Sequence, residues 1–390
     1  MKTKILILIS SLLLFFSSKK EPYKIVITVK NTLKIDRQFE TIELTKEQLN
    51  LADLSFYGVK NMKSKELLVS QTVDLDADGI MDQLLFQPII KANSEEKFEV
   101  VKISKKPSKD TIENCYSRFV PERTDDYAWE NNKVAFRAYG PTAQKMVEEN
   151  IKGGTLSSGI DAWLKKVDYP IINKWYKKES EKKGTYHEDT GEGLDNFHVV
   201  ISRGVGGIAV KNESVYTYSK NYTKWRTITT GPIRTSFYLE YANWKAGENE
   251  ISESKIITLD YGNNLSKFEI SIQGIPTISA GLTLHENDGK VTVNNEHSWI
   301  SYWQPHEDSE LGTAIITKKN HFAGQETYET TSKDESNAYM HMNIINNKVE
   351  YYAGFTWKKS NQFKDKLAWE NYLNDFSKKI ENPLLVKIKK

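Results

Sequence analysis

Residues 186–199, YHEDTGEGLDNFHV, gather two imidazoles, four carboxylates and a phenol around two glycines. This group is suited to acid–base catalysis, in which Tyr186 and His187 exchange protons with a substrate while Arg203, further along the chain, neutralises the substrate's carboxylate. An adjacent arginine is also expected to lower the pKa of the tyrosine and make it a competent base. These three residues are our candidate catalytic set.

The same stretch allows two other interpretations. Its imidazoles and carboxylates are ligand types of a transition-metal site, although their spacing matches no HxxxH or HxH pattern. The ligands would be His187, Asp189, Glu192, Asp195 and His198. The third interpretation is a purely structural hydrogen-bonded network, in which the carboxylates hold the histidines in place.

A second polar motif, DLDADGIMD at residues 74–82, has carboxylates at positions one, three, five and nine and a glycine at position six. This pattern wraps one hard cation, so it predicts a structural calcium ion in a loop between strands. Its ligands would be Asp74, Asp76, Asp78 and Asp82. Position twelve is Leu85, where an EF-hand has a bidentate glutamate, so a helix–loop–helix calcium sensor is excluded. The alternative is an acidic turn without metal, and no cofactor is expected for catalysis.

Arginines stand beside aromatic residues in FVPERTDDYAWENNKVAFRAYGP, residues 119–141. The alternation of KVAFRAYG predicts a strand whose arginine and tyrosine share one face. A guanidinium binds a carboxylate through two parallel hydrogen bonds, so this segment favours an acidic sugar as ligand. The candidate substrate-binding residues here are Arg123, Glu130, Arg137 and Tyr139. The alternative is a surface ion pair between Glu130 and Arg137.

Further candidates for binding a sugar are spread along the chain. Flat aromatic rings stack on sugar faces, and charged groups bind the hydroxyl and carboxylate groups of the sugar. These residues are Trp163, Lys165, Glu192, Arg234 and Trp303. Burial in the core is the alternative for each tryptophan.

The composition is that of an exported soluble protein. Its 54 basic and 52 acidic residues nearly balance, which argues against a nucleic-acid partner. Residues 1–20 have the layout of a secretory signal peptide, with two early lysines, an apolar run and small residues at its end. Nothing later resembles a membrane-spanning segment, so we expect a periplasmic or secreted location without membrane association. Cys115, the only cysteine, is expected to be buried.

Strands dominate the expected secondary structure. Period-two alternation predicts antiparallel strands in KIVITVKNTL, QFETIELT, KVAFRAYG, IRTSFYLEY, KFEISIQG, LGTAIITKK and VEYYAGFTW. The few helices are expected at residues 141–150, around 161–167, and from about 362 to 380. We expect a mainly β protein made of the signal peptide (1–20), a small N-terminal β-domain (21–108) and a large antiparallel β-sandwich with a C-terminal helix (109–390). The lysine- and proline-rich residues 102–110 would link the two domains.

Five motifs occur in a specific order: VDLDADGIMDQLLFQ, RFVPERTDDYAWENNKVAFRAYGP, SGIDAWLKKVDYPIINKWY, YHEDTGEGLDNFHVVISRGVGGIAV and TTGPIRTSFYLEY. Together they resemble a bacterial family of exported proteins from polysaccharide-utilisation systems, long catalogued as a domain of unknown function. The resemblance covers nearly the whole chain after the signal peptide. It implies a dehydratase for oligosaccharides of ulvan, the sulfated rhamnose- and uronate-containing polysaccharide of green algae. By analogy with that function, the sandwich is expected to be like those of lyases and sugar mutarotases.

Such a dehydratase removes water from the non-reducing-end uronic acid and leaves a 4,5-unsaturated uronate. This elimination needs a base for the C5 proton, donors that stabilise the enolate-like carboxylate, and an acid for the leaving hydroxyl. If the resemblance holds, His187 is base or acid, Tyr186 is its partner, and Arg203 clamps the carboxylate together with Arg137 or Arg234. The expected partner is an acidic oligosaccharide.

Three other functions remain open at this point. A polysaccharide lyase uses the same elimination with a sugar as leaving group, and yields two fragments where a dehydratase yields one chain lighter by one water. A carbohydrate-binding protein binds the sugar without turnover. A metal-dependent hydrolase contains a bound transition metal, and chelation of that metal abolishes activity.

Overall fold

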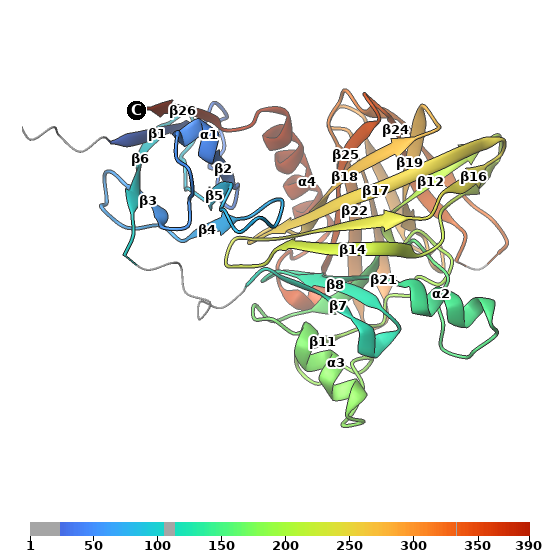
Figure 1. The fold of residues 1–390 in the computed structure, drawn as a ribbon. Coiled ribbons are helices and arrows are strands. Elements are labelled where there is room, and N and C mark those ends of the chain that lie inside the picture. Colours follow the sequence, from blue (N-terminus) through green and yellow to red (C-terminus); the bar gives the residue numbers. More distant parts are fainter. Residues whose placement is uncertain (1–23, 105–113, 333) are drawn as a thin grey trace, which may run out of the picture.

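The computed structural model describes residues 24–104, 114–332 and 334–390. The expected signal peptide, most of the expected linker and the expected boundary at 108/109 lie outside these residues. Antiparallel strands are the predominant regular element of the described chain, which confirms the mainly β, sandwich-like class. The strands form a small N-terminal unit and a larger body, which stand side by side in Figure 1. In the described part of the chain, no helix has the length and apolar character needed to cross a membrane.

The N-terminal unit consists of two antiparallel sheets around an apolar core of their own. The first sheet has the order β26-β1-β6-β3, with the bounds Ile25–Lys30 (β1), Tyr57–Asn61 (β3), Glu95–Lys102 (β6) and Leu385–Lys389 (β26). The second has the order β2-β5-β4, with Ile42–Thr45 (β2), Ser70–Val73 (β4) and Gln83–Phe86 (β5), and the short helix α1 (Lys46–Leu49) follows β2. The apolar residues of β1 alternate into the core, as its sequence predicts.

The last strand, β26, pairs antiparallel with β1, so that Lys389 lies opposite Val26 and Leu385 opposite Lys30. The chain therefore returns from the body to the N-terminal unit at its end, as Figure 1 shows. The sequence does not predict this pairing, because LVKIK is short and mostly exposed, and no buried face identifies its partner. The two units are thus joined at two places along the chain.

Two sheets form the sandwich of the body. The larger, nine-stranded sheet has the order β14-β15-β17-β18-β25-β22-β21-β20, with β16 beside β17, and its bounds are Tyr222–Thr229 (β14), Arg234–Tyr241 (β15), Trp244–Ala246 (β16), Asn249–Asp260 (β17), Leu265–Gln273 (β18), Lys290–Asn294 (β20), Trp299–His306 (β21), Ser309–Thr317 (β22) and Lys348–Trp357 (β25). The five-stranded sheet has the order β13-β12-β19-β24-β23, with Val205–Asn212 (β12), Val215–Thr217 (β13), Thr277–Thr283 (β19), Phe322–Tyr328 (β23) and Asn337–Asn343 (β24). All seven segments with period-two alternation contain strands of these sheets or of those described above and below.

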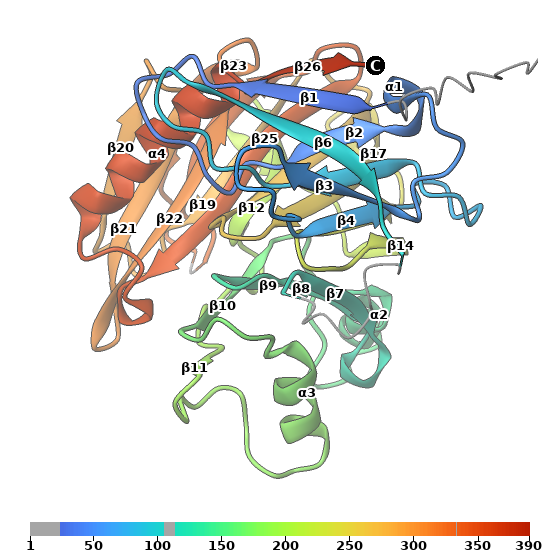
Figure 2. The same ribbon diagram turned by 90° about the vertical axis from the view of Figure 1, so that its left-hand side faces the viewer.

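A third sheet of the body, in the order β11-β10-β9-β8-β7, carries most of the candidate site. Its strands are Tyr116–Val120 (β7), Asp126–Glu130 (β8), Ala135–Ala138 (β9), Asp161–Lys165 (β10) and Gly193–Leu194 (β11). In Figure 2 these strands lie below the N-terminal unit, with helix α3 beneath them. The side chains of β8, β9 and β10 are buried on both faces, so this sheet is packed between other layers.

Two of the three expected helices are confirmed: α2 (Pro141–Glu148) and α4 (Lys366–Glu381), which ends where Asn382 precedes Pro383. The helix expected around 161–167 is wrong. That segment is strand β10, because pairing with β9 and burial on both faces outweigh its intrinsic preference. The helix in this region is instead α3 (Ile172–Ser180).

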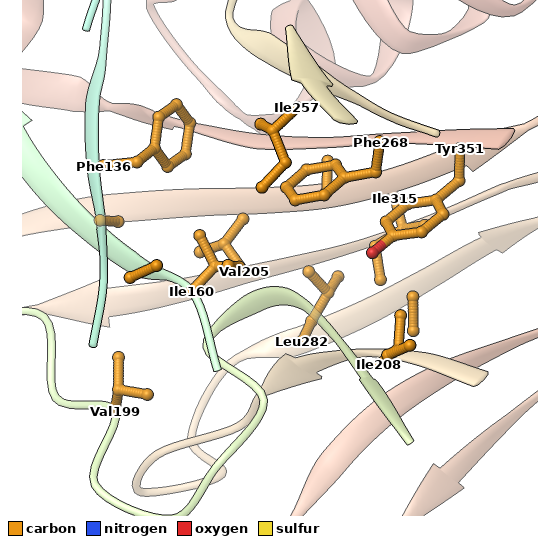
Figure 3. Close-up of a cluster of buried hydrophobic side chains, with 14 of the residues drawn as sticks. Phe136, Ile160, Val199, Val205, Ile208, Ile257, Phe268, Leu282, Ile315 and Tyr351 are labelled. Carbon is orange, nitrogen blue, oxygen red and sulfur yellow. The ribbon is translucent and has the colours of Figure 1, made fainter. Parts of the chain in front are cut away.

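One contiguous apolar core connects the three sheets of the body. Figure 3 shows Phe136 of β9 and Ile160 facing Ile257 and Phe268 of the large sheet, with Leu282 of the five-stranded sheet nearby. Burial of this many apolar side chains is the main force that fixes the third sheet against the sandwich. The polar residues of the third sheet therefore sit on a rigid support.

Candidate functional site

An open cavity of about 530 Å³ lies on the third sheet, between the region of α2 and the chain that follows β11. Its walls come from residues 123–126 between β7 and β8, from β9, from residues 147–156, and from residues 187–201. Two arginines, two histidines and two carboxylates face it. The structure thus brings the polar stretch 186–199 together with the arginine-rich segment 119–141.

Arg137 stands at the centre of three buried carboxylates. Its Nε donates to Oδ2 of Asp161 at 2.8 Å and its Nη2 donates to Oδ2 of Asp195 at 3.0 Å, while Nη1 lies 3.7 Å from Oδ2 of Asp126. Asp161 is the cross-strand partner of Arg137 in the register of β9 and β10. Because these acceptors already occupy its guanidinium, Arg137 organises the cavity wall. The alternative interpretation, a surface ion pair between Glu130 and Arg137, is wrong, because Glu130 pairs with Lys165.

Tyr186 is almost fully buried, and its hydroxyl lies between the two arginines. Nε of Arg123 is 3.3 Å and Nη1 of Arg137 is 3.4 Å from the phenolic oxygen, and the ring packs on Trp163 at 5.0 Å. The two guanidinium groups lower the pKa of Tyr186, as expected, but burial raises it by more, so the pKa lies above its ordinary value and the expected tyrosine base is wrong. Tyr186 thus remains protonated at neutral pH and fixes the arginines.

Arg123 is the arginine of this site that keeps donors for a ligand. It donates hydrogen bonds to the neutral oxygens of Tyr186 and Thr124, both at 3.3 Å. Within residues 24–104, 114–332 and 334–390, no carboxylate lies within 4.0 Å of its guanidinium. Since it lines the cavity, Arg123 can bind an incoming carboxylate.

His187 lines the cavity with an exposed ring. Its Nδ1 is 2.7 Å from the carbonyl oxygen of Asp195, and because a carbonyl only accepts, Nδ1 carries a hydrogen. In the neutral ring Nε2 therefore has a free lone pair that can accept a proton. The backbone hydrogen bond from Asp195 to the carbonyl of Tyr186, at 2.8 Å, ties the two ends of the 186–195 loop together.

Glycines shape the loop between His187 and Asp195, as expected. Gly191 and Gly193 have φ values of 112° and 113°, and a Cβ on Gly193 would lie 1.9 Å from the carbonyl oxygen of Leu164. Only glycine allows β11 to approach β10 so closely.

Burial dominates the ionisation of the carboxylates around Arg137. It raises the pKa of Asp126 to about 6 and, together with repulsion from Asp195, raises the pKa of Asp161 to about 7. One oxygen of Asp161 is buried and has no hydrogen-bond partner among the described residues, which is consistent with a carboxyl group that keeps its proton. This cluster therefore titrates near neutral pH.

Asp126→Asn is expected to become more stable relative to the wild type as pH rises from 4 to 7. Folding raises the pKa of Asp126 from 3.8 to about 6, so the native state binds the extra proton, and wild-type stability falls across this window by up to about 3 kcal/mol. Urea unfolding at pH 4.5 and 7.5 measures the trend. Asp36→Asn is the control: Lys91 lowers the pKa of this exposed carboxylate below 3.8, so its stability difference from wild type should stay nearly constant between pH 4.5 and 7.5. A stability difference between Asp126→Asn and wild type that does not vary with pH contradicts the prediction.

The structure does not place Arg203 in the site. Its side chain is fully buried, its guanidinium donates to Oγ of Ser158 at 3.0 Å and to the carbonyl of Ile201 at 2.9 Å, and it stacks on the ring of Tyr218 at 3.6 Å. The assignment of Arg203 as carboxylate clamp is therefore wrong, because core groups use its donors. Arg123, in contrast, lines the cavity.

Arg234 is also remote from the cavity. Its Nε lies 2.6 Å from Oδ1 of Asp260, and its Nη1 lies 2.5 Å from Oε1 of Glu43 in the N-terminal unit. It thus links the two units and lines a different cavity of about 500 Å³. Its assignment to the carboxylate clamp is wrong as well.

Glu130 and Lys165 form an ion pair inside the body, so their assignment to substrate binding is wrong. Nζ of Lys165 lies 2.7 Å from Oε2 of Glu130, and both side chains are fully buried. The carboxylate also accepts the backbone N–H groups of Ile171 and Ile172 at 2.9–3.0 Å, where α3 begins. The pair therefore positions α3 under the third sheet.

The side chains of three other candidate substrate-binding residues contact neighbouring residues of the protein. Trp163 is buried against Tyr186 and Trp175, and Trp303 is buried beside α4 with Trp369. Glu192 binds Lys174 at 2.7 Å and lines a second cavity of about 600 Å³ next to α3. The core interpretation therefore holds for both tryptophans. Tyr139 does line the site, with its ring 5.2 Å from the guanidinium carbon of Arg137.

The aspartate loop lies between β4 and β5, as expected. Within the described part of the chain, Asp74, Asp76 and Asp78 are the group of acidic or histidine side chains that could reach one metal ion. Asp82 instead pairs with Lys46 at 2.5 Å. Calcium binding at this loop stays a prediction.

The transition-metal interpretation of the 186–199 stretch is not supported by the positions of its side chains. Among the described residues, the ligand atoms of these histidines and carboxylates do not come close enough together to bind one metal ion. Asp189 pairs with Lys166 at 2.6 Å and Glu192 with Lys174, while Asp195 binds Arg137. The stretch thus combines a structural network with two histidines that face the cavity.

Sequence reasoning missed Asp126 and Asp161 as parts of the site. The available signal for Asp161 was its alternation with Trp163 and Lys165, which places these three side chains on one face of a strand. No local pattern marks Asp126. It joins Arg137 only through the pairing of β8 with β9, and strand pairing is a long-range property.

Comparisons with known proteins give a family but no activity. The family described as Domain of unknown function (DUF4861) matches residues 29–386. The chain is 55% identical over 379 residues to "Uncharacterized protein P7" of Formosa agariphila, which covers 96% of each chain. A glycosyl hydrolase family 38 protein from Enterococcus faecalis aligns with a TM-score of 0.52 and 10% identity, over 94% of this chain and 47% of that chain. An alpha-mannosidase from Enterococcus faecalis V583 aligns with a TM-score of 0.46 and 10% identity, over 94% of this chain and 46% of that chain. The chain spans about half the length of these two solved structures, and the first shows a likeness of fold alone.

Proposed function

This chain belongs to the DUF4861 family, and we propose that it is a dehydratase. It would eliminate water from the non-reducing-end uronic acid of ulvan-type oligosaccharides and leave a 4,5-unsaturated uronate. The motifs that resemble the family's dehydratase suggest the substrate. The observation that carries the chemistry is the cavity itself, which places Arg123, with donors to spare, and His187, whose Nδ1 meets a backbone carbonyl, on one open wall.

Arg123 binds the substrate's carboxylate in this proposal. Removing the C5 proton moves electrons into that carboxylate, and a fixed guanidinium stabilises the charge that develops there. Tyr186 accepts from Nε of Arg123 and from Arg137, and the carboxylates hold Arg137 in turn. The clamp is thus fixed before the substrate arrives, which lowers the reorganisation needed in the transition state.

His187 removes the C5 proton. The carbonyl of Asp195 holds Nδ1–H, and this leaves Nε2 as the basic atom on the cavity side of the ring. The electron pair of the broken C–H bond forms the C4–C5 double bond as the C4–O bond breaks, and the hydroxyl leaves as water once it is protonated. His187 then returns its proton to solvent through its exposed ring.

The direct test is incubation of the purified protein with uronate-terminated ulvan oligosaccharides. A dehydratase produces the ultraviolet absorbance of a conjugated unsaturated uronate and one product lighter by one water per chain. Absorbance together with two shorter fragments identifies a lyase. Binding of the oligosaccharide with no change in absorbance or mass refutes an enzymatic role on this substrate.

Arg123→Ala is expected to raise KM for the uronate-terminated oligosaccharide by about tenfold or more, and to lower kcat as well, because the lost charge-assisted hydrogen bonds act in both the bound substrate and the transition state. Steady-state kinetics measure both constants. Arg226→Ala is the matched control: Arg226 is an exposed arginine whose hydrogen bond goes to the carbonyl of Leu75, away from the cavity. Equal kinetics of the Arg123 and Arg226 variants would exclude Arg123 as the clamp.

A further inference from the structure

We infer that His198, held by Asp334, is the acid that protonates the leaving hydroxyl, and that His187 is the base. This inference rests on the proposed function and completes it, because an elimination of water needs two proton carriers. Tyr186 was the expected partner of His187, but its hydroxyl is buried between two arginines. Another group of the cavity must therefore supply the proton.

His198 lies on the wall of the same cavity as His187. Its side chain is 58% exposed, and its Nδ1 is 3.4 Å from Oδ1 of Asp334, whose side chain is 7% exposed. The other ring nitrogen, Nε2, has no hydrogen-bond partner among the described residues. Imidazole both releases and accepts protons near neutral pH, so a ring with one nitrogen fixed and the other open to a cavity can act as a proton carrier.

A neighbouring histidine fixes the backbone of His198. Nε2 of His285 donates to the carbonyl oxygen of His198 at 2.9 Å, and Nδ1 of His285 meets the side-chain amide of Gln304. The ring of His285 also stands edge-on to Phe197, with 4.7 Å between the ring centres. Burial lowers the pKa of His285, so this ring stays neutral and holds the segment without competing for protons.

The partner of each Nδ1 distinguishes the two proton carriers. His187 meets the neutral carbonyl of Asp195, and the nearby Asp195 carboxylate is already bound to Arg137. His198 meets the carboxylate of Asp334. Asp334 can pair with an imidazolium at His198, which has a proton to give, whereas the carbonyl beside His187 holds Nδ1–H and leaves Nε2 to take one. His198 is accordingly the donor and His187 the acceptor.

The reaction balances with these two residues. Nε2 of neutral His187 takes the C5 proton, the C4–C5 double bond forms, and the C4–O bond breaks as the hydroxyl takes the proton of Nε2 of imidazolium His198. The products are one water, one unsaturated uronate, protonated His187 and neutral His198. Exchange of one proton with solvent at each exposed ring restores the starting state.

The test compares His198→Ala, Asp334→Asn and His321→Ala with the wild type on uronate-terminated ulvan oligosaccharides. His321 is the control, because it is a histidine outside the cavity, and its Nδ1 meets the backbone carbonyl of Asn343 at 2.9 Å. We expect His198→Ala to lower kcat about 100-fold or more with little change in KM, and added imidazole to restore part of the rate. Asp334→Asn should lower kcat about tenfold or more, because it removes the carboxylate that orients the ring and pairs with its imidazolium form.

The outcomes separate this inference from the proposed function. If the wild type dehydrates the substrate and His198→Ala keeps a normal kcat, the inference is wrong and the dehydratase stands. If the wild type forms no unsaturated product, the dehydratase is wrong and the inference is overturned with it. If His198→Ala folds poorly, His198→Gln replaces it, and a folded variant with reduced kcat that imidazole does not rescue overturns the role as proton donor. Circular dichroism and oligosaccharide binding establish that each variant is folded.

Discussion

Replacing His187 by alanine is expected to lower kcat for the dehydration of uronate-terminated oligosaccharides by about 10²–10⁴-fold. The ring is exposed on the cavity wall, so its loss leaves the core intact and removes the group whose Nε2 takes the C5 proton. Because Arg123 still binds the carboxylate, KM should change by less than kcat. Initial rates from ultraviolet absorbance, over a range of substrate concentrations, give both constants.

His321→Ala is the matched control for this variant as well, because it removes an equivalent histidine whose Nδ1 meets a backbone carbonyl. It should retain the wild-type kcat. Turnover by His187→Ala within a factor of about three of the wild type would exclude His187 as the base. Since His187 is the only member of the expected catalytic set that the structure leaves facing the cavity, that result would require a different base for the reaction.

Replacing Lys165 by methionine is expected to cost about 3–5 kcal/mol of unfolding free energy, because the carboxylate of Glu130 is left buried without its cation. Two backbone carbonyls, of Asn131 and Tyr169, lose their donor as well. The damage should spread to α3, whose first N–H groups bind Glu130. Methionine keeps the length of the side chain, so the loss measures charge and hydrogen bonding more than volume.

Lys166→Met provides the comparison one residue along the chain. Lys166 is partly exposed and pairs with Asp189, and such an ion pair near the surface contributes less than about 1 kcal/mol. Urea unfolding gives the loss of unfolding free energy in each variant. The two losses are comparable when the slope of free energy against urea concentration is the same in both variants. Equal midpoints for Lys165→Met and Lys166→Met would show that the buried ion pair stabilises the protein no more than the partly exposed one.

The strands of this fold could be predicted because burial leaves a periodic signature in the sequence. Residues 237–241 and 268–273 alternate strictly between buried and more exposed side chains, and each segment lies in a strand with its apolar face in the core. Residues 161–165 do not alternate in polarity, because neighbours cover both faces of β10, and they were taken for a helix. The alternation of polar and apolar residues thus cannot identify a strand that is buried on both faces.

The residue types of the site could be predicted more readily than the partners of its members. Arg123, Arg137, Tyr139, Tyr186 and His187 were chosen from their chemistry, and all of them lie on or just behind one cavity wall. Arg203 and Lys165 carry the same kinds of charge but lie in the interior. Whether a charged side chain meets solvent or a buried partner depends on which distant strands pair with one another. Neighbouring residues in the sequence do not determine that pairing.

The pairing of β26 with β1 also sets an order for assembly. Ile27 lies opposite Ile388, so the first sheet of the N-terminal unit lacks an edge partner until nearly the whole chain has been made. Until then β1 offers an open strand edge, the feature on which chains mispair and aggregate. Such distant contacts also close late, because a long loop must be ordered before they form. A cut anywhere between 104 and 114 should accordingly leave two fragments that remain associated, because the C-terminal strand of one completes a sheet of the other.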